Sequence, residues 1–264
     1  MSLAATTTHQ YSKNTQTTQL LLTHWREMSR NASNFYFTML FPFIMFGMFL
    51  GMGKILKDAM SGSGFDFSIM TVPMGLCLAL TGTCMTLTAT PISDYRQHGT
   101  LRVLGTTPVS RTTFILTHLL VRLVVAVVLS VGIILVGLIF GVTDIEALGR
   151  AVLVIVPSCM LFLGLGYILG SLINSGQVAA NITTLIQMII LFTSGVGVPF
   201  IILPDNVLKV LDWVPTTYFG DLLFWVSGSS AQRHSLGLDF AVVGGSAVIA
   251  VLAAIFIFKW DVGD

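Results

Sequence analysis

Sulfur-bearing side chains recur at helical spacing in the first hundred residues. Met45, Met48 and Met52 follow one another at intervals that place them on one face of a helix. A similar face follows at Met70, Met74, Cys77 and Cys84. Thioethers and thiolates are soft ligands that bind monovalent copper, so copper transport is one interpretation. Adaptable packing and a wall for apolar ligands are the two others, because methionine is flexible and polarizable.

Two further sets of residues have types that hydrolytic chemistry uses. Ser194 and His118 are the arguable nucleophile and base of an intramembrane hydrolase, but they fall near opposite membrane faces and no carboxylate accompanies them. The stretch 51–54, Gly-Met-Gly-Lys, resembles the end of a phosphate-binding loop. Position 48 is methionine instead of glycine, and Ile55 stands where Ser or Thr is required. We therefore expect no nucleotide site and no enzymatic activity on this chain.

The composition excludes a soluble globular domain. Of the 264 residues 54% are hydrophobic and only 9% are charged, whereas an average soluble domain has roughly 25% charged residues. The mean hydropathy of +0.87 indicates a membrane protein. A net charge of +1 and a pI near 7.8 exclude a nucleic-acid binder, which would have a clustered basic excess. The cysteines Cys77, Cys84 and Cys159 lie in apolar runs, so we expect neither a disulfide framework nor a metal site.

Charged residues are so sparse that they divide the chain into apolar spans. An ionised side chain at the centre of a bilayer costs several kcal/mol, and one span needs about 20 apolar residues. The apolar stretch 151–204 is long enough for two spans and breaks at 174–177. The sequence therefore predicts an all-α membrane protein, with one transmembrane domain over 16–264. Six spans are expected, at about 31–53, 67–93, 114–143, 151–173, 178–203 and 240–258.

The N-terminal region is polar before the first span. Residues 1–15 are expected to form a disordered leader. Leu21, Trp25 and Met28 then recur at helical spacing, with His24 and the charged residues mostly elsewhere around the helix. This pattern favours a short helix in the membrane interface, and the alternative is a soluble extension of the first span.

The distribution of charge predicts the orientation. On the side that holds both termini there are seven basic and four acidic residues, and on the other side five basic and eight acidic ones. Since cytoplasmic loops carry the excess of Lys and Arg, both termini are predicted to be cytoplasmic, in the cell membrane. Arg122 belongs to neither set. We expect 112–122 to continue the third span into the cytoplasmic interface with Arg122 snorkelling, the alternative being an arginine that faces substrate.

The cytoplasmic loop 94–111 holds three of the seven basic residues on its side. A short helix is expected over 95–104 and would end at Gly105. The sequence Thr-Pro-Val-Ser at 107–110 would then turn the chain toward the next span. A compact polar helix beneath two spans would suit a rigid contact with a cytoplasmic partner.

This loop resembles that of the permease subunits of type-2 ABC transporters, a class that includes drug, lipid and polysaccharide exporters. The match is carried by His-Gly-Thr-Leu at 98–101 followed by Thr-Pro-Val-Ser at 107–110, after the second span. In that family the loop is part of a coupling helix that seats in a groove of a separate ATP-binding subunit. The residues that the resemblance assigns to this contact are Asp94, Arg96, His98, Gly99, Thr100, Leu101 and Arg102. Arg102 departs from the family, which commonly has an acidic residue there, and an ordinary basic loop is the alternative.

The resemblance also implies partners and a function. The partners would be an ABC ATP-binding subunit that holds ATP and Mg, a second permease copy, identical or related, and membrane lipids. No cofactor on this chain and no nucleic acid are expected. The predicted function is ATP-driven export of an amphiphilic or hydrophobic drug, peptide or lipid. The alternatives are an ion-coupled carrier and a copper exporter. An ion-coupled carrier needs ionisable residues inside the spans, whereas every acid of this sequence is placed at the end of a span.

Polar side chains inside the second and fifth spans mark a candidate substrate path, because polar groups in lipid seek partners or a hydrated cavity. Hydrogen bonding between or within helices is the alternative. With two methionines of the first span, the candidates are Thr83, Thr86, Thr90, Asn181, Thr184, Gln187, Met45 and Met48.

The outer segment 194–228 is rich in helix breakers. Asp205 is expected to cap a short helix that runs to Trp213, and a second helix is expected over 216–226. This arrangement resembles the paired re-entrant helices that close the exit in the same family. The resemblance implies an outer gate, with Pro199, Trp213, Pro215 and Tyr218 as candidates, and an aromatic belt at headgroup depth is the alternative.

Overall fold

The computed structural model describes residues 13–30, 32–59, 67–100 and 111–257, and these form helices joined by turns and loops, without a strand among them. Helices suit these apolar stretches because a backbone in a bilayer must form its hydrogen bonds within its own segment. The elements are α1 (Lys13–Arg30), α2 (Ala32–Ala59), η1 (Phe67–Met70), α3 (Thr71–Thr81), η2 (Gly82–Thr86), α4 (Leu87–Gln97), α6 (Arg111–Ile139), α7 (Glu146–Leu172), α8 (Gly176–Thr193), η3 (Phe200–Ile202), α9 (Asp205–Leu211), α10 (Pro215–Val226) and α11 (Leu236–Ile257).

Six helical stretches of the described residues are long and apolar enough to cross a membrane, which confirms the predicted all-α membrane protein. They are Phe35–Gly53, Ser68–Gln97, Thr113–Ile139, Glu146–Leu172, Gly176–Thr193 and Leu236–Ile257. The predicted ends of some spans are wrong. The fifth helix stops at Thr193, ten residues before the predicted end, because Gly195 has a φ of +74° and turns the chain.

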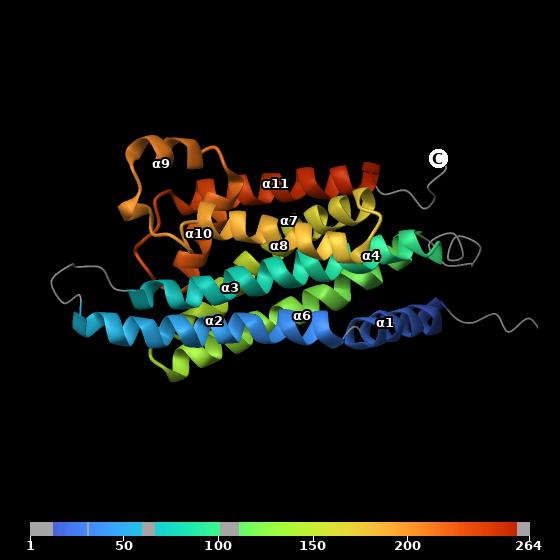
Figure 1. Cartoon of the computed structure of the whole chain (residues 1–264), viewed down its shortest axis with the longest axis horizontal. Helices are drawn as coiled ribbons and strands as arrows, with labels where there is room; N and C mark the ends of the chain where they lie inside the picture. Colours follow the sequence, from blue (N-terminus) through green and yellow to red (C-terminus); the bar gives the residue numbers. More distant parts are fainter. Residues whose placement is uncertain (1–12, 31, 60–66, 101–110, 258–264) are drawn as a thin grey trace, which may run out of the picture.

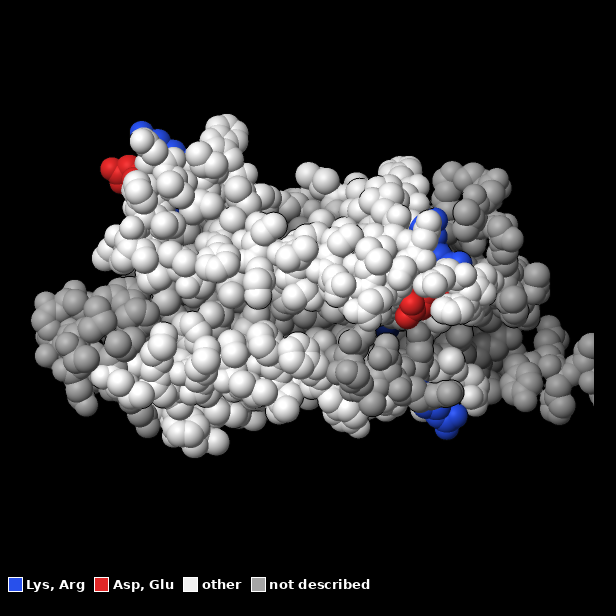
Figure 2. Space-filling model, viewed as in Figure 1, with Lys and Arg blue, Asp and Glu red and all other residues white. Residues whose placement is uncertain are grey.

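The two ends of the helix bundle carry different elements (Figure 1). At one end, which we call the α4 end, α4 ends, α1 and α6 begin and α11 ends. α9 and α10 lie at the opposite end, which we call the α10 end. Figure 2 shows charged atoms toward the two ends of the visible face, with a broad uncharged band between them. This distribution is that of a protein whose middle lies in hydrocarbon.

The second span forms the centre of the bundle. It runs through α3, η2 and α4, and 89% of its most apolar 18-residue stretch is buried, against 22% for the span formed by α8. η2 is a single π-helical turn, and Pro91 lies inside α4 just beyond it. Both features disturb the regular backbone hydrogen bonding of a helix. The most enclosed span is therefore also the most irregular.

The loop between α6 and α7 is fixed by local hydrogen bonds. Gly141, with a φ of +70°, ends α6, and the Val142 N–H donates to the Gly137 carbonyl (3.0 Å), as in a Schellman motif. Asp144 accepts a bond from the Ala147 N–H (3.0 Å) and pairs with Arg150. The hydrogen bond from Arg150 holds the pKa of the Asp144 carboxyl below its usual range.

Candidate functional site

The described part of the predicted ATPase contact, residues 94–100, lies where α4 ends. The His98 N–H donates to the Asp94 carbonyl (3.0 Å), and Gly99 follows with a φ of +68°. The prediction of one helix over 95–104 is wrong in its first part, because α4 stops at Gln97 and Gly99 takes the left-handed conformation that ends helices. Leu101, Arg102 and the predicted turn at 107–110 lie outside the described residues.

Asp94 is engaged within the chain. Its Oδ1 accepts a hydrogen bond from the Gly176 N–H at the start of α8 (3.0 Å). This approach requires glycine, because a Cβ at Gly176 would overlap the Asp94 carboxylate. A carboxylate at this place satisfies a free N–H group and interacts favourably with the helix dipole. Asp94 therefore fixes α8 to the end of α4, whereas His98 is exposed at the same end.

Asp94→Ala is expected to lower the free energy of unfolding by about 1 kcal/mol, the usual effect of removing an N-cap. Asp94→Asn should cost less, because its amide oxygen can still accept the Gly176 N–H. Thermal unfolding in detergent measures both. Asp205, in the first turn of α9, makes no side-chain cap bond, so Asp205→Ala is the matched control. Equal losses of stability for Asp94→Ala and Asp205→Ala would contradict the capping role.

The path candidates of the second span are enclosed in the protein. Thr83, Thr86 and Thr90 have exposed fractions of 0%, 9% and 5%. η2 and α4 pack against α7 and α8, which cover these positions. Gln187 of α8 belongs to the same contact, since its Nε2 donates to the Thr81 hydroxyl (2.9 Å) and the Leu78 carbonyl (3.3 Å). Gln187 therefore connects α8 to α3, whereas the buried hydroxyls of Thr83, Thr86 and Thr90 make no hydrogen bond with the described residues.

The other two path candidates of α8, Asn181 and Thr184, lie on the surface instead. Gln177, Asn181, Thr184 and Met188 are exposed and recur at helical spacing along one face, which we call the α8 stripe. Gln177 Nε2 donates to Asn181 Oδ1 (3.3 Å), and the Thr184 hydroxyl donates to its own helix at the Ala180 carbonyl (2.8 Å). Because amides within a span avoid lipid, the α8 stripe is suited to contact protein or water.

α2 and α8 both approach the π turn. A Cβ built on Gly82 of η2 would be 3.1 Å from Thr38 of α2 and 3.4 Å from Gln187 of α8. α2 has a largely exposed apolar side, and Met48 is 50% exposed there while Met45 is partly buried. The candidates Met48, Asn181 and Thr184 therefore lie on two helices that flank η2, while the threonines of the second span are packed behind them.

The sulfur residues do not form one surface. Met48 and Met52 are exposed on α2, whereas Met70, Met74, Cys77 and Cys84 are buried. Among the described residues all three cysteines are free and buried. This separation favours packing for the buried sulfurs, because a copper path would need its ligands along one accessible route.

The two short helices predicted in the outer segment are present as α9 and α10. Asp205 does not cap α9 as predicted, because Pro204 occupies the position before the helix and no side-chain bond is formed. Trp213 is 89% exposed, Pro199 precedes η3, and Pro215 is the first residue of α10. The Tyr218 hydroxyl donates to the Asp212 carbonyl (2.7 Å), which joins the two helices.

α10 is inserted into the protein and fixed to the end of α8. Its residues from Phe219 to Phe224 are buried. The Thr217 hydroxyl donates to the Thr193 carbonyl (3.0 Å), and the Thr193 and Thr216 hydroxyls are 2.6 Å apart. A movement of α8 would therefore be transmitted to α10.

The prediction that Arg122 snorkels to the interface is wrong. The residue is 1% exposed, and its Nε donates to the Leu87 carbonyl (3.0 Å). The normal partner of that carbonyl would be the N–H of residue 91, which is proline and has none. Arg122 supplies the missing donor, and its Nη1 also donates to the His118 carbonyl (3.2 Å). The alternative of an arginine facing substrate is not favoured in this conformation.

A buried aromatic and imidazole cluster surrounds the first turns of α6. The rings of His24 and His118 are 5.1 Å apart, and the Tyr167 hydroxyl is 2.7 Å from His118 Nδ1. His24 was assigned to the polar side of the N-terminal helix and is instead 2% exposed, because α1 packs on α6.

Ser194 lies at the end of α8 and donates to Leu191 (3.1 Å), so it does not meet His118 as a hydrolase would require.

Comparison with known proteins identifies one family. Residues 60–258 match the family model described as ABC-2 family transporter protein. The match includes all spans except the first, together with residues 94–102, α9 and α10. No curated protein matches the chain.

Proposed function

Because the chain belongs to the ABC-2 family of transporter proteins, we propose that it is the membrane subunit of an exporter that a separate ATP-binding subunit drives. Its place as a multi-pass ABC transporter permease follows from the family and the six candidate spans. Permeases of this family are typically non-catalytic, and the sequence has no phosphate-binding loop. ATP and Mg would be bound by the partner.

The observation that carries the proposal is the arrangement of the α4 end. Asp94 joins the end of α4 to the first residue of α8 (3.0 Å), and the exposed His98 lies one turn beyond Asp94. A force applied at 94–102 would therefore act on two spans together. α8 is bonded in turn to α10 through Thr193 and Thr217 (3.0 Å). This series of contacts supports a transmission of movement from the ATPase contact to the outer gate.

The substrate path is proposed to run along α2, η2 and α8. The α8 stripe carries amides that are unfavourable toward lipid, and a second permease copy would cover it. The neighbouring face of α2 is apolar, with Met48 exposed on it. A neutral path lined by amide, hydroxyl and apolar groups fits an amphiphile better than a polyanion. The protein is placed in the cell membrane with both termini on the cytoplasmic side, which the excess of Lys and Arg on that side supports.

Inside-out vesicles that contain the chain together with its ATP-binding subunit test this function. Addition of ATP is expected to accumulate a fluorescent cationic amphiphile in the lumen and to increase ATP hydrolysis when the amphiphile is present. Vesicles with only an imposed ion gradient are the control, because an ion-coupled carrier would transport without ATP. Transport without ATP, or ATP-dependent loss of amphiphile from the lumen, would contradict the proposal.

A further inference from the structure

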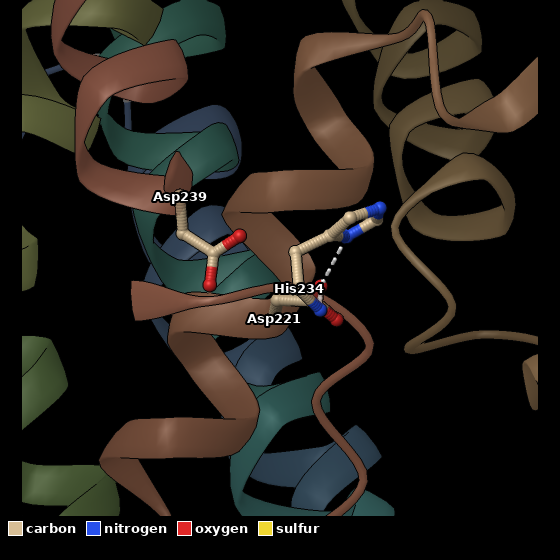
Figure 3. A group of neighbouring side chains, drawn as sticks. All are labelled: Asp221, His234 and Asp239. Atoms are coloured by element: carbon tan, nitrogen blue, oxygen red, sulfur yellow. Dashed lines mark hydrogen bonds and ion pairs between the residues drawn. The ribbon is translucent and has the colours of Figure 1, made fainter. Parts of the chain in front are cut away.

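Three side chains of metal-binding type converge at the α10 end (Figure 3). Asp221 comes from α10, His234 from the segment between α10 and α11, and Asp239 from the first turn of α11. One potential ligand atom of each lies within 4.8 Å of those of the other two. Both aspartates are 0% exposed, so two carboxylates are enclosed close together.

Hydrogen bonds within the protein leave much of this pair unsatisfied. Asp221 Oδ2 accepts the His234 backbone N–H (3.1 Å) and lies 2.8 Å from His234 Nδ1. Asp221 Oδ1 and both carboxylate oxygens of Asp239 are buried, and no described residue donates to them. Buried polar atoms are normally paired, and two adjacent buried carboxylates are costly without a positive charge.

The nearby arginine is directed away from the cluster. Arg233 Nη1 is 2.8 Å from the Asp212 carboxylate, and the Arg233 guanidinium lies over the Phe200 ring at 5.1 Å. It therefore does not provide the positive charge that the open oxygens of Asp221 and Asp239 require.

We infer that Asp221, His234 and Asp239 bind a divalent transition-metal ion of the zinc class. One imidazole and two carboxylates are a ligand set that zinc accepts, with a fourth position left for water. Mg²⁺ and Ca²⁺ prefer oxygen ligands alone, and the imidazole disfavours them. His234 Nε2 lies 3.4 Å from Asp212 Oδ1, and metal-binding histidines commonly direct their second nitrogen at a carboxylate.

The inferred site would join α10 to α11 across the segment 227–235. It does not depend on the direction of transport, the substrate or the ATP-binding partner. No metal was expected from the sequence, because Asp221, His234 and Asp239 form no spaced motif and both acids were counted only as charges on the outer side of the membrane. Their burial at the start of α11 and within α10 is what reveals them.

Zinc titration of the purified full chain, prepared without a histidine tag and treated with chelator, tests the inference. Calorimetry is expected to give one site per chain, and saturating Zn²⁺ should raise the Tm by several degrees while Mg²⁺ leaves it unchanged. Asp239→Asn keeps the shape of the side chain and should weaken zinc binding by at least about tenfold, since it removes a ligand charge. Asp205→Asn, at an exposed acid of α9 outside the cluster, should bind zinc as the wild type does.

Cobalt provides a readout that does not require a variant to fold. Co²⁺ bound to the wild-type chain at a four-coordinate site should give a visible absorption band, and Zn²⁺ should abolish it by competition. The inference is overturned if the wild type shows neither a zinc-dependent Tm shift nor the cobalt band. It is equally overturned if Asp239→Asn retains the zinc affinity of the wild type.

Discussion

Gly99→Glu is expected to reduce the amount of ATP-binding subunit that copurifies with the chain by at least about tenfold, which corresponds to ~1.4 kcal/mol of binding free energy. The residue lies directly beyond His98 at the α4 end, among the residues assigned to the ATPase contact. No atom of the described residues lies within 4 Å of a Cβ built there, so the described part of the chain leaves room for a larger side chain. It would meet the partner surface with a buried charge and with bulk, both of which oppose binding.

Gly141→Glu is the matched control for this experiment. Gly141 has a φ of +70°, nearly the +68° of Gly99, and a Cβ built on it is also more than 4 Å from the neighbouring atoms of the described residues. A side chain at either place is strained by about 1 kcal/mol, so both variants lose similar intrinsic stability and gain the same charge. Gly141 follows α6 at the other end of the bundle. Copurification should therefore survive in Gly141→Glu.

Fluorescence-detected size exclusion first confirms that both variants fold, and the ATPase bound per chain is then measured. Equal retention of the ATP-binding subunit by Gly99→Glu and Gly141→Glu would remove 94–102 from the contact. It would not change the membership of the chain in the ABC-2 family, which rests on residues 60–258.

The spans could be predicted because their signal is compositional. Charges at their ends and apolar residues between them are enough to place six helices, and the short helices α9 and α10 follow from prolines and glycines around them. The predicted end of the fifth span is wrong for a related reason. Residues 194–203 are as apolar as the span, but Gly195 and Pro199 bend them into a turn that hydrophobicity does not report.

The fate of individual polar residues could not be predicted, because it depends on contacts between distant segments. Arg122 is buried since Pro91, on another helix, leaves the Leu87 carbonyl without a donor. Neither the sequence around Pro91 nor the sequence around Arg122 indicates that the arginine replaces the donor that the proline lacks. Asp94, which was assigned to the ATPase contact, also accepts a hydrogen bond from Gly176, a residue 82 positions later. The spacing of residues along the sequence does not indicate which distant segments come into contact.

The insertion of α10 beside α8 depends on the absence of one side chain. A Cβ built on Gly220 would overlap the Ser194 carbonyl oxygen and lie 2.7 Å from the Ser194 carbonyl carbon. These are backbone atoms at the end of α8, so they cannot move aside as a flexible side chain would. The bond from Thr217 to the Thr193 carbonyl (3.0 Å) fixes the same contact from the adjacent turn. Any side chain at Gly220 must separate the two helices.

Gly220→Ala is accordingly expected to lower the free energy of unfolding by about 3 kcal/mol, at the upper end of overpacking effects. Thermal unfolding in detergent measures the change. Gly244→Ala in the middle of α11 is the control, since a Cβ there meets no neighbouring atom within 4 Å in the part of the chain that the structure describes. It should be neutral or stabilising by up to about 1 kcal/mol, because alanine favours the helix over glycine. If Gly220→Ala is as stable as Gly244→Ala, α10 is not packed against α8, and movement of α8 could not reach the outer gate by this route.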